Sequence, residues 1–316
     1  YGRVCHVQEG DFEDVQKAVA TAKAAFRLNT PWRTMNASKH GLPLLKLASL
    51  VEGNAKYIAQ TLEALDNGKP VSSALGFVNF SVGILRYYAR YADKIHGKNL
   101  PVDGNTIALT RQEPAGVVAA IVPWNYPFFL SVLKLAPALA AGCTIVLKPA
   151  EQTPLSGIYI GNLIHEAGEL IPTPVMLELG GKSPFIIFAD ADHRRSRSGK
   201  NQGARLVTGD CRLGNKGYYI QPTVFADVTD EMVIAKEEIF GPVHSILKFE
   251  TIDEFIERAN SGIYGLGAGV YTSDMDKAMR VAQACETGSF WINCYKVESP
   301  QTPFGGYKMS GIGKEM

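Results

Sequence analysis

The sequence predicts an α/β protein built on a doubly wound parallel sheet. Two near-continuous apolar runs, residues 116–122 and 144–147, have the composition of strands that are buried on both faces. Each run is followed by a stretch with helical spacing, residues 128–141 and 155–167. Strands and helices that alternate in this way are typical of sheets that bind nucleotides at their carboxyl edge.

The region before this alternation is predicted to be helical. Apolar residues recur at helical spacing in residues 15–26, 44–51, 58–65 and 77–95. Asp11 can cap the first of these helices, and Asn67-Gly68 is a typical end for the third. The aromatic residues of the fourth stretch are interpreted as core packing, the commonest use of such a stripe.

The second half of the chain repeats the alternation of strands and helices. Strands are predicted there at 185–188, 244–249, 267–271 and 289–293, and helices at 252–259 and 275–285. One further strand, at 107–111, is predicted in the first half, before the run at 116–122. No GxGxxG sequence occurs, because the run Gly265–Gly269 lacks the last spacing. A dinucleotide site in this chain is therefore not of the usual fingerprint type.

Composition and charge exclude several classes of function. The 316 residues carry a formal net charge of +1, so no large field of one sign is available to attract nucleic acid or an anionic membrane. No apolar run is long enough to span a bilayer, and no secretory signal is visible. The five cysteines form no CxxC and no metal-ligand spacing. We expect a cytoplasmic protein without a metal site, in which Cys143 and Cys294 are buried free thiols.

Two polar loops follow the two buried strands. PWNYP, residues 123–127, offers the amide of Asn125 as a donor to a developing oxyanion, although an asparagine between prolines is also a common turn. KPAEQTP, residues 148–154, offers Lys148 and Glu151 to ribose hydroxyls or a phosphate. Its alternative interpretation is a solvated loop between a strand and a helix.

Two further motifs carry carboxylates. ELGGKSP places Glu178 beside two glycines, where it can serve as a tunable base or lie exposed in a tight turn. EEIFGP, residues 237–242, combines Glu238 with Phe240. That pair can hold a ribose and pack against a flat ring, or it can be a capped loop beside a core aromatic residue.

The order of these motifs along the chain resembles that of the NAD(P)-dependent aldehyde dehydrogenase superfamily. WINCY at 291–295 and PFGGYKMSG at 303–311 complete the series. PWRTMNAS at 31–38 and TRQEPAGVV at 110–118 resemble the cytosolic class, which includes retinal dehydrogenases. The resemblance extends over nearly the whole chain.

The resemblance implies a fold and an assembly. It implies a doubly wound Rossmann-type NAD-binding domain, an α/β catalytic domain and a small β oligomerisation arm. The corresponding segments are residues 1–178, with the N-terminal helices and the NAD-binding domain, 179–288 with the catalytic domain, and 289–316 with the return to the NAD-binding and oligomerisation region. A homo-oligomer, dimer or tetramer, is the assembly expected from the family.

The resemblance also implies a reaction and the residues that perform it. A cysteine thiolate attacks a small-molecule aldehyde, hydride passes to NAD⁺, and water releases the acid from a thioester. Asn125 matches the oxyanion-hole amide and Glu178 the base that activates water. The remaining matches concern the cofactor: Ile121 and Trp124 line its cleft, Lys148 and Glu151 surround the adenosine ribose, Glu238 holds the nicotinamide ribose, and Phe240 lies beside the nicotinamide. The carboxylate of Glu151 favours NAD over NADP.

This chain lacks two segments of the family pattern. After Gly168 the family continues with a strand, a glycine turn and a helix start that receives the pyrophosphate. Here only nine residues separate Gly168 from Glu178. After Asp192 the family continues to the nucleophile loop and much of the catalytic domain, whereas here HRRSR at 193–197 leads directly into SGKNQGARL.

None of the cysteines present matches the family nucleophile. Cys294, in WINCY, is the least unsuitable, but its context is a strand end. Removing a strand from a doubly wound sheet leaves edge groups unpaired. We therefore expect a parent enzyme that contains the two segments. The alternative is a shortened, inactive structural protein on the same scaffold, of the lens-crystallin type.

Overall fold

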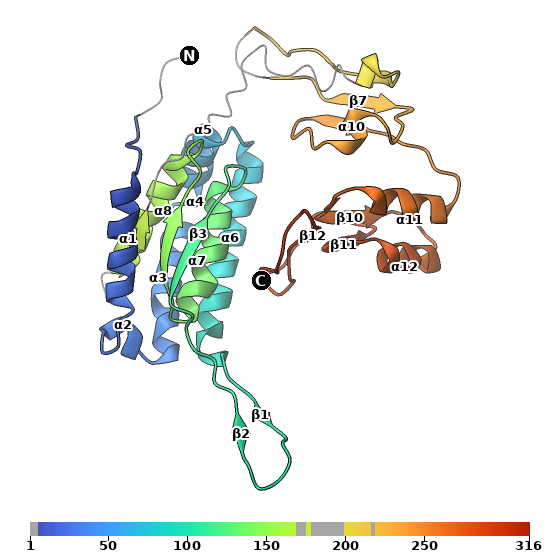
Figure 1. The fold of residues 1–316 in the computed structure, drawn as a ribbon. Helices are drawn as coiled ribbons and strands as arrows, with labels where there is room; N and C mark the ends of the chain where they lie inside the picture. The colour runs from blue at the N-terminus through green and yellow to red at the C-terminus, as the bar shows by residue number, and fades with distance from the viewer. Residues whose placement is uncertain (1–5, 169–174, 178–198, 216–218) are drawn as a thin grey trace. The chain divides into compact units, whose positions relative to one another are not determined.

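The computed structural model describes residues 6–168, 175–177, 199–215 and 219–316, and it divides into two compact units, 1–184 and 185–316. The first unit combines a helical layer with a parallel sheet, and the second is a smaller α/β unit (Figure 1). The predicted strand at 185–188 and the motif ELGGKSP lie outside the described residues. The predicted division into three segments stays a prediction.

The elements of the first unit follow one another as helices and then as alternating strands and helices. They are α1 (Phe12–Ala25), α2 (Pro31–Thr34), α3 (Ala37–Gly53), α4 (Ala55–Tyr57), the π-helix η1 (Ile58–Glu63), α5 (Ala64–Asp66), α6 (Val71–Tyr91), the 3₁₀ helix η2 (Ala92–Lys94), β1 (Asn99–Leu100), β2 (Ala108–Leu109), β3 (Val117–Ile121), α7 (Pro127–Ala140), β4 (Thr144–Lys148), α8 (Pro154–Ala167) and β5 (Val175–Leu177).

The sheet β3–β4–β5 is parallel throughout, as predicted. The expected burial on both faces is confirmed for β4 but is wrong for β3, where Ala119 and Ile121 are exposed. The helices α1 and α7 cover β4 more than β3.

Val146 of β4 packs against Ala18 and Ala22 of α1. Successive side chains of a strand point to opposite faces, so Ile145 and Leu147 point away from α1, and α7 contacts β4 there. Both of these side chains are fully buried. Helices therefore cover both faces of β4, the arrangement of a doubly wound sheet.

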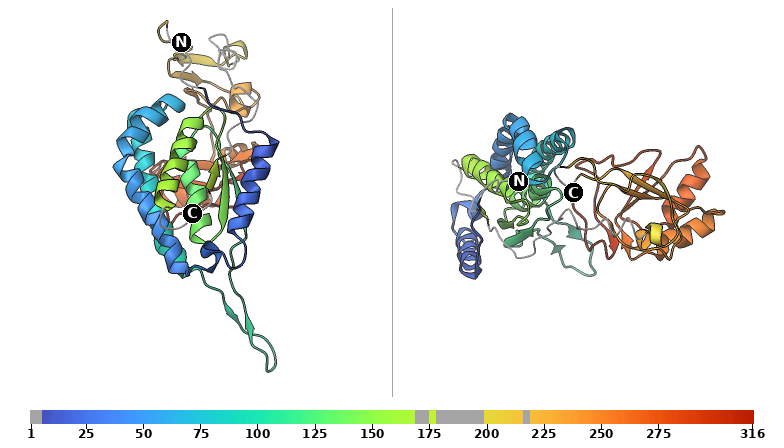
Figure 2. Two further views of the ribbon diagram at one scale, coloured as in Figure 1. Left: turned by 90° about the vertical axis from the view of Figure 1, so that its left-hand side faces the viewer. Right: turned by 90° about the horizontal axis from the view of Figure 1, so that it is seen from above.

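A second layer of helices packs behind α7, with α3 and α6 side by side (Figure 2). Leu44, Ile84 and Leu85 are fully buried in this layer. The aromatic stripe of α6 is only partly core: Phe80 and Tyr88 are half-buried, and Tyr91 is exposed. Their rings pair instead near the helix surface, as Phe80 does with Phe129 of α7 at 5.5 Å between ring centroids.

The helix predicted at 58–65 is π-helical over its first six residues. η1 runs from Ile58 to Glu63 and continues into α5, which ends before Asn67-Gly68 as predicted. π-helical turns are rare and are frequent at functional sites, because the inserted residue redirects the side chains around it. Here the last residue of η1 is Glu63, whose side chain points into the interior.

Trp32 of α2 forms hydrogen bonds with the two residues that precede β4. Its indole Nε1–H donates to the carbonyl oxygens of Gly142 and Cys143, both at 3.2 Å, and the side chain is 1% exposed. The ring of His40 lies 4.6 Å from the Trp32 ring, and Nε2 of His40 is 3.1 Å from the Trp32 carbonyl oxygen. Burial lowers the pKa of His40, while its bond to the Trp32 backbone opposes that shift.

The lowered pKa of His40 predicts a loss of stability on mild acidification. The unfolded chain takes up a proton first, so the free energy of unfolding falls as pH drops below about 6.5, the usual histidine value. Above that pH both states are neutral and no penalty applies. We expect the free energy of unfolding, measured with denaturant at several pH values, to depend less on pH in His40→Gln than in the wild type. If the free energy of unfolding falls equally with pH in the two proteins, His40 does not cause the loss of stability in acid.

The second unit contains short strands and four-to-ten-residue helices. They are β6 (Arg205–Thr208), β7 (Thr223–Ala226), α10 (Val233–Lys236), β8 (Val243–Ser245), α11 (Ile252–Ser261), β9 (Tyr264–Gly265), β10 (Gly267–Val270), α12 (Met275–Ala284), β11 (Ser289–Ile292) and β12 (Tyr307–Lys308). The strand predicted at 244–249 is thus shorter, whereas α11, α12, β10 and β11 confirm their predictions. Phe225, Val228 and Ile234 form the buried core beneath the sheet β6–β7–β8.

One burial prediction needs correction. Cys143 is buried as expected, but Cys294 follows β11 and is only half-buried. Cys294 lies two residues beyond the end of β11, in a segment whose neighbours Asn293 and Tyr295 are exposed. Across the described ranges, no helix is both long and apolar enough to cross a membrane.

Candidate functional site

The two polar loops of the first unit begin at the same edge of the parallel sheet. Ile121, the last residue of β3, is paired with Lys148, the last residue of β4. The N–H of Val122 donates to the Lys148 carbonyl oxygen at 3.0 Å and extends the ladder by one bond. The carboxyl ends of neighbouring parallel strands are where open α/β sheets bind ligands. The structure therefore places both loops at the expected edge.

Asn125 is half-buried in the loop after β3. Oδ1 of its amide is buried and has no hydrogen-bond partner among the described residues. Buried polar atoms are nearly always paired, so an orphaned amide end at a sheet edge indicates a group that binds a ligand or water. The backbone of Asn125 is, in contrast, tightly held: its carbonyl oxygen accepts from Lys69 Nζ at 2.9 Å.

Apolar and polar side chains flank Asn125 along the same edge. Ile121 is 71% exposed and Trp124 is 37% exposed, so both offer apolar surface at this edge. Lys148 and Glu151 are half-buried. Lys148 Nζ donates to the Pro149 carbonyl oxygen at 3.3 Å, and Glu151 Oε1 accepts from its neighbour Gln152 at 3.0 Å.

This set of side chains can bind a flat ring and a sugar. Exposed Ile121 and Trp124 offer apolar surface to a flat ring. Lys148 can donate to ribose hydroxyls and Glu151 can accept from them. The sequence lacks the segment expected to receive the pyrophosphate after Gly168, and residues 169–174 lie outside the described residues.

The helix after the second loop is fixed by a carboxylate from elsewhere in the chain. Asp66, the last residue of α5, accepts from the backbone N–H groups of Leu155 at 3.2 Å and Ser156 at 2.8 Å. Burial raises the pKa of Asp66, and its bonds to Ser156 and Leu155 act in the opposite direction. Gly157 allows the first turn of α8 to approach Pro149, since an added Cβ would lie 2.6 Å from the proline ring.

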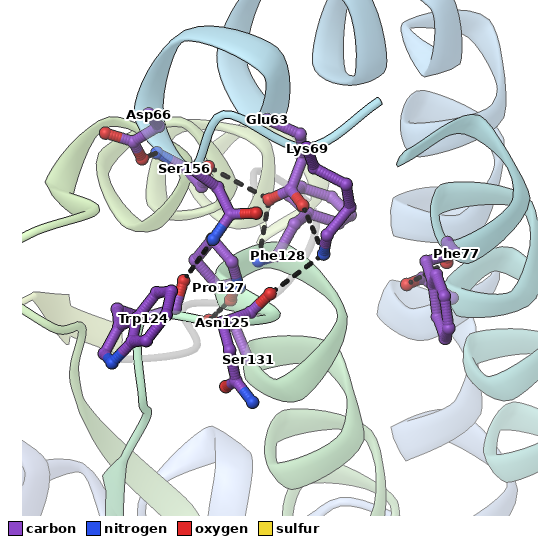
Figure 3. A network of polar contacts seen from close by, with 12 residues as sticks. Glu63, Asp66, Lys69, Phe77, Trp124, Asn125, Pro127, Phe128, Ser131 and Ser156 are labelled. Carbon is purple, nitrogen blue, oxygen red and sulfur yellow. Dashed lines mark hydrogen bonds and ion pairs between the residues drawn. The ribbon is translucent and has the colours of Figure 1, made fainter. Parts of the chain in front are cut away.

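A network of polar groups, centred on the buried side chain of Glu63, lies behind the two loops, and the sequence patterns did not reveal it. It consists of Glu63, Asp66, Asn67 and Lys69, which surround the turn between α5 and α6 (Figure 3). Asn67 Nδ2 donates to the Trp124 carbonyl oxygen at 2.7 Å. The only signal in the sequence is the presence of charged residues in a helix whose neighbours are apolar.

Glu238 and Phe240 belong to the second unit and follow α10. Both are exposed. Phe240 adopts a φ of 53°, in the left-handed region that is costly for a residue with a large side chain. Such strain is concentrated at functional sites, where the surrounding chain enforces it. Glu178, the predicted base, lies outside the described residues.

The described cysteines do not supply a nucleophile beside Asn125 within the first unit. Cys143 directly precedes β4, so it lies at the end of that strand opposite to Lys148. Cys211, Cys285 and Cys294 belong to the second unit, and burial raises the pKa of the Cys285 thiol. A raised pKa disfavours the reactive thiolate. No cluster of metal-binding side chains occurs in the described parts of the chain.

Comparison with known proteins gives one consistent result. The model of the Aldehyde dehydrogenase family matches residues 2–173 and 193–316. Aldehyde dehydrogenase 1A1 of Gallus gallus is 41% identical over 432 residues, which cover 99% of this chain and 85% of that protein. The mitochondrial aldehyde dehydrogenase of Homo sapiens is 40% identical over 431 residues, covering 99% of this chain and 83% of the relative.

Solved structures show the same similarity in three dimensions. The NAD⁺ complex of aldehyde dehydrogenase from Bacillus cereus superposes with a TM-score of 0.86 at 35% identity, covering 98% of this chain and 86% of that one. The indole-3-acetaldehyde dehydrogenase AldA of P. syringae, also bound to NAD⁺, has a TM-score of 0.87 at 31% identity, with coverages of 98% and 86%.

The alignments also locate residues that this chain lacks. An alignment 432 residues long exceeds the 316 residues of the chain, so it places stretches of the relative opposite gaps in this sequence. The two stretches matched by the family model are separated by residues 174–192, which contain Glu178. The interruption begins within the nine residues that follow Gly168 and ends at Asp192, where the motif pattern breaks a second time.

Proposed function

Because this chain belongs to the aldehyde dehydrogenase family, we propose that the protein oxidises an aldehyde to a carboxylic acid with NAD⁺ through a cysteine thioester. The observation that carries the proposal is the common edge of β3 and β4. There the side-chain amide of Asn125, which carries the Nδ2–H donors, lies in the loop after one strand, and Lys148 ends the other.

Each residue of this edge has a role in the proposal. Asn125 donates a hydrogen bond to the oxyanion that forms when the nucleophile adds to the carbonyl carbon. Lys148 and Glu151 hold the adenosine ribose, and Ile121 and Trp124 line the cofactor cleft. Bound NAD⁺ supplies the hydride acceptor.

Residues outside this edge complete the proposed site. Glu178 activates the water that releases the acid, and in the second unit Glu238 holds the nicotinamide ribose while Phe240 packs beside the nicotinamide ring. Further parts of the proposal follow from resemblance to the cytosolic class: a cytoplasmic protein, NAD in preference to NADP, and a dimer or tetramer assembled through a β arm.

The nucleophile is expected in the stretch that the sequence lacks between Asp192 and Ser198. A peptide map of the protein isolated from its source tests this directly. The expected result is a cysteine-containing peptide that joins Asp192 to Ser198 through more residues than the five in HRRSR, with an intact mass above 34.3 kDa.

A second candidate is a catalytically inactive structural protein on the same scaffold, of the lens-crystallin type. The observation that favours it is that Cys143 lies at the amino end of β4, opposite to Lys148. The other described cysteines belong to the second unit. A peptide map that reads HRRSR without interruption, together with an absence of NADH formation, would establish this candidate and exclude the first.

A further inference from the structure

Two helices begin beside the polar loops, and neither caps itself. α7 starts at Pro127 and α8 at Pro154, and their N-cap residues, Tyr126 and Thr153, make no side-chain cap hydrogen bond. The hydroxyl of Thr153 is buried without a partner among the described residues. The first N–H groups of a helix have no partner within the helix, so a buried helix start needs acceptors from elsewhere.

Glu63 supplies an acceptor to both helix starts at once. Its Oε1 accepts from the backbone N–H of Phe128 at 3.2 Å and from the hydroxyl of Ser156 at 3.2 Å (Figure 3). The Glu63 side chain is 2% exposed. A carboxylate at a helix N-terminus is also favoured by the helix dipole. One buried anion thus joins the first turn of α7, after β3, to the first turn of α8, after β4.

Lys69 completes the network on the side of Asn125. Its Nζ lies 3.5 Å from Glu63 Oε2 and donates to the Asn125 carbonyl oxygen at 2.9 Å. The same ammonium group lies 3.7 Å from the centroid of the Tyr126 ring. The Lys69 side chain is 8% exposed. Burial lowers the pKa of Lys69, and the charge of Glu63 and its hydrogen bond to Lys69 oppose that shift.

We propose that Glu63 and Lys69 are positioning residues for the oxyanion-hole loop, acting through the backbone of Asn125. The inference rests on the proposed role of Asn125. Lys69 fixes the Asn125 carbonyl and the Tyr126 ring, while Glu63 fixes the N–H of Phe128. One ion pair therefore contacts three of the four residues 125–128. The side-chain Oδ1 of Asn125 takes no part in this network.

A positioning role differs from plain structural support in one testable respect. Lys69→Met leaves the Glu63 carboxylate buried without its cation, which alone destabilises a protein. The double variant Lys69→Met/Glu63→Gln removes that unpaired charge while the Asn125 carbonyl still lacks its donor. If the pair only stabilises the fold, the double variant regains wild-type behaviour. If it positions the loop, the loop stays altered in the double variant.

Amide hydrogen exchange of the full chain measures this difference without depending on activity. We expect exchange of the Phe128 and Leu130 amides to rise about tenfold in Lys69→Met and in the double variant, since one hydrogen bond to a charged group contributes that much. Exchange at Val146 of β4 is expected to be unchanged in the double variant. Lys69→Arg, which keeps a cation and a donor, is expected to restore protection.

Lys46 provides a matched control. It also donates from Nζ to a distant backbone carbonyl, that of Glu166 at 2.6 Å, but it does not contact the loop. Lys46→Met is expected to leave exchange at Phe128 and Leu130 unchanged. Wild-type exchange at these two amides in the double variant would overturn the inference, and so would an equal rise at Val146.

Kinetics give a second, separable readout. With aldehyde and NAD⁺, the double variant is expected to lose about tenfold in kcat while KM for NAD⁺ is unchanged, as for an interaction that acts on the reacting centre. An unchanged kcat in a variant with altered exchange would overturn the positioning role. If the wild-type protein forms no NADH, the proposed function fails, and the exchange comparison still decides whether the ion pair positions the loop.

Discussion

Replacing Trp32 with alanine is expected to lower the free energy of unfolding of the first unit by about 3–5 kcal/mol. The side chain is 1% exposed, so the substitution leaves a cavity of nearly the whole indole. It also removes the donor that binds the carbonyl oxygens of Gly142 and Cys143, and it uncovers one face of His40. The loss therefore acts at the junction between α2, α3 and the start of β4.

Trp32→Phe separates packing from hydrogen bonding in this prediction. Phenylalanine retains most of the apolar volume and loses the N–H, so a smaller cost of about 1–3 kcal/mol is expected from the two unpaired carbonyl groups. Denaturant unfolding followed by far-ultraviolet circular dichroism compares the three proteins. A cost below about 1 kcal/mol for Trp32→Ala would contradict the role of Trp32 as a core anchor.

Replacing Asn125 with alanine is expected to lower kcat for aldehyde oxidation about 10²–10³-fold, the usual effect of removing one oxyanion donor. The backbone of residue 125 is held by Lys69 through its carbonyl oxygen, so the loop keeps its course when the side chain is shortened. Stability is expected to change little, because Oδ1 forms no hydrogen bond with the described residues that the substitution could break.

The control for this prediction is Asn79→Ala, which shortens an exposed asparagine on α6. It is expected to leave both kcat and stability as in the wild type. Steady-state NADH formation and thermal unfolding are measured on all three proteins. A fall in kcat of less than about threefold in Asn125→Ala would remove Asn125 from the oxyanion hole, since loss of a single donor costs far more.

The sequence was sufficient for the elements whose pattern is local. β3 and β4 were predicted because their runs are apolar on both faces, and α7 and α8 because their apolar residues recur at helical spacing. The carboxyl edge of the sheet follows from these four elements alone, because consecutive parallel strands end on the same side. The positions of Asn125 and Lys148 could be predicted for that reason.

The polar network could not be predicted from the same patterns. Glu63 bonds to Phe128 and Ser156, which lie 65 and 93 residues further along the chain, and no local periodicity encodes such contacts. The π-helical turn before it has no simple sequence signature either. Hydrophobic spacing predicts which face of a helix is buried, but it does not predict that a carboxylate on that face has two helix starts as partners.

No segment of the printed sequence matches the nucleophile loop of the family. The motif order breaks after Asp192, and the match to the family model is interrupted over residues 174–192. The described cysteines occupy a strand start, a turn, a helix end and a strand end. None of these is the polarised loop that an attacking thiolate needs.

Formation of NADH by the protein purified from its source, incubated with a short aliphatic aldehyde and NAD⁺, tests the central claim most directly. The expected result is NADH formation that requires both substrates and yields one carboxylic acid per NADH. The result that would contradict aldehyde oxidation is a folded protein that forms no NADH and whose peptide map joins Asp192 to Ser198 through HRRSR alone.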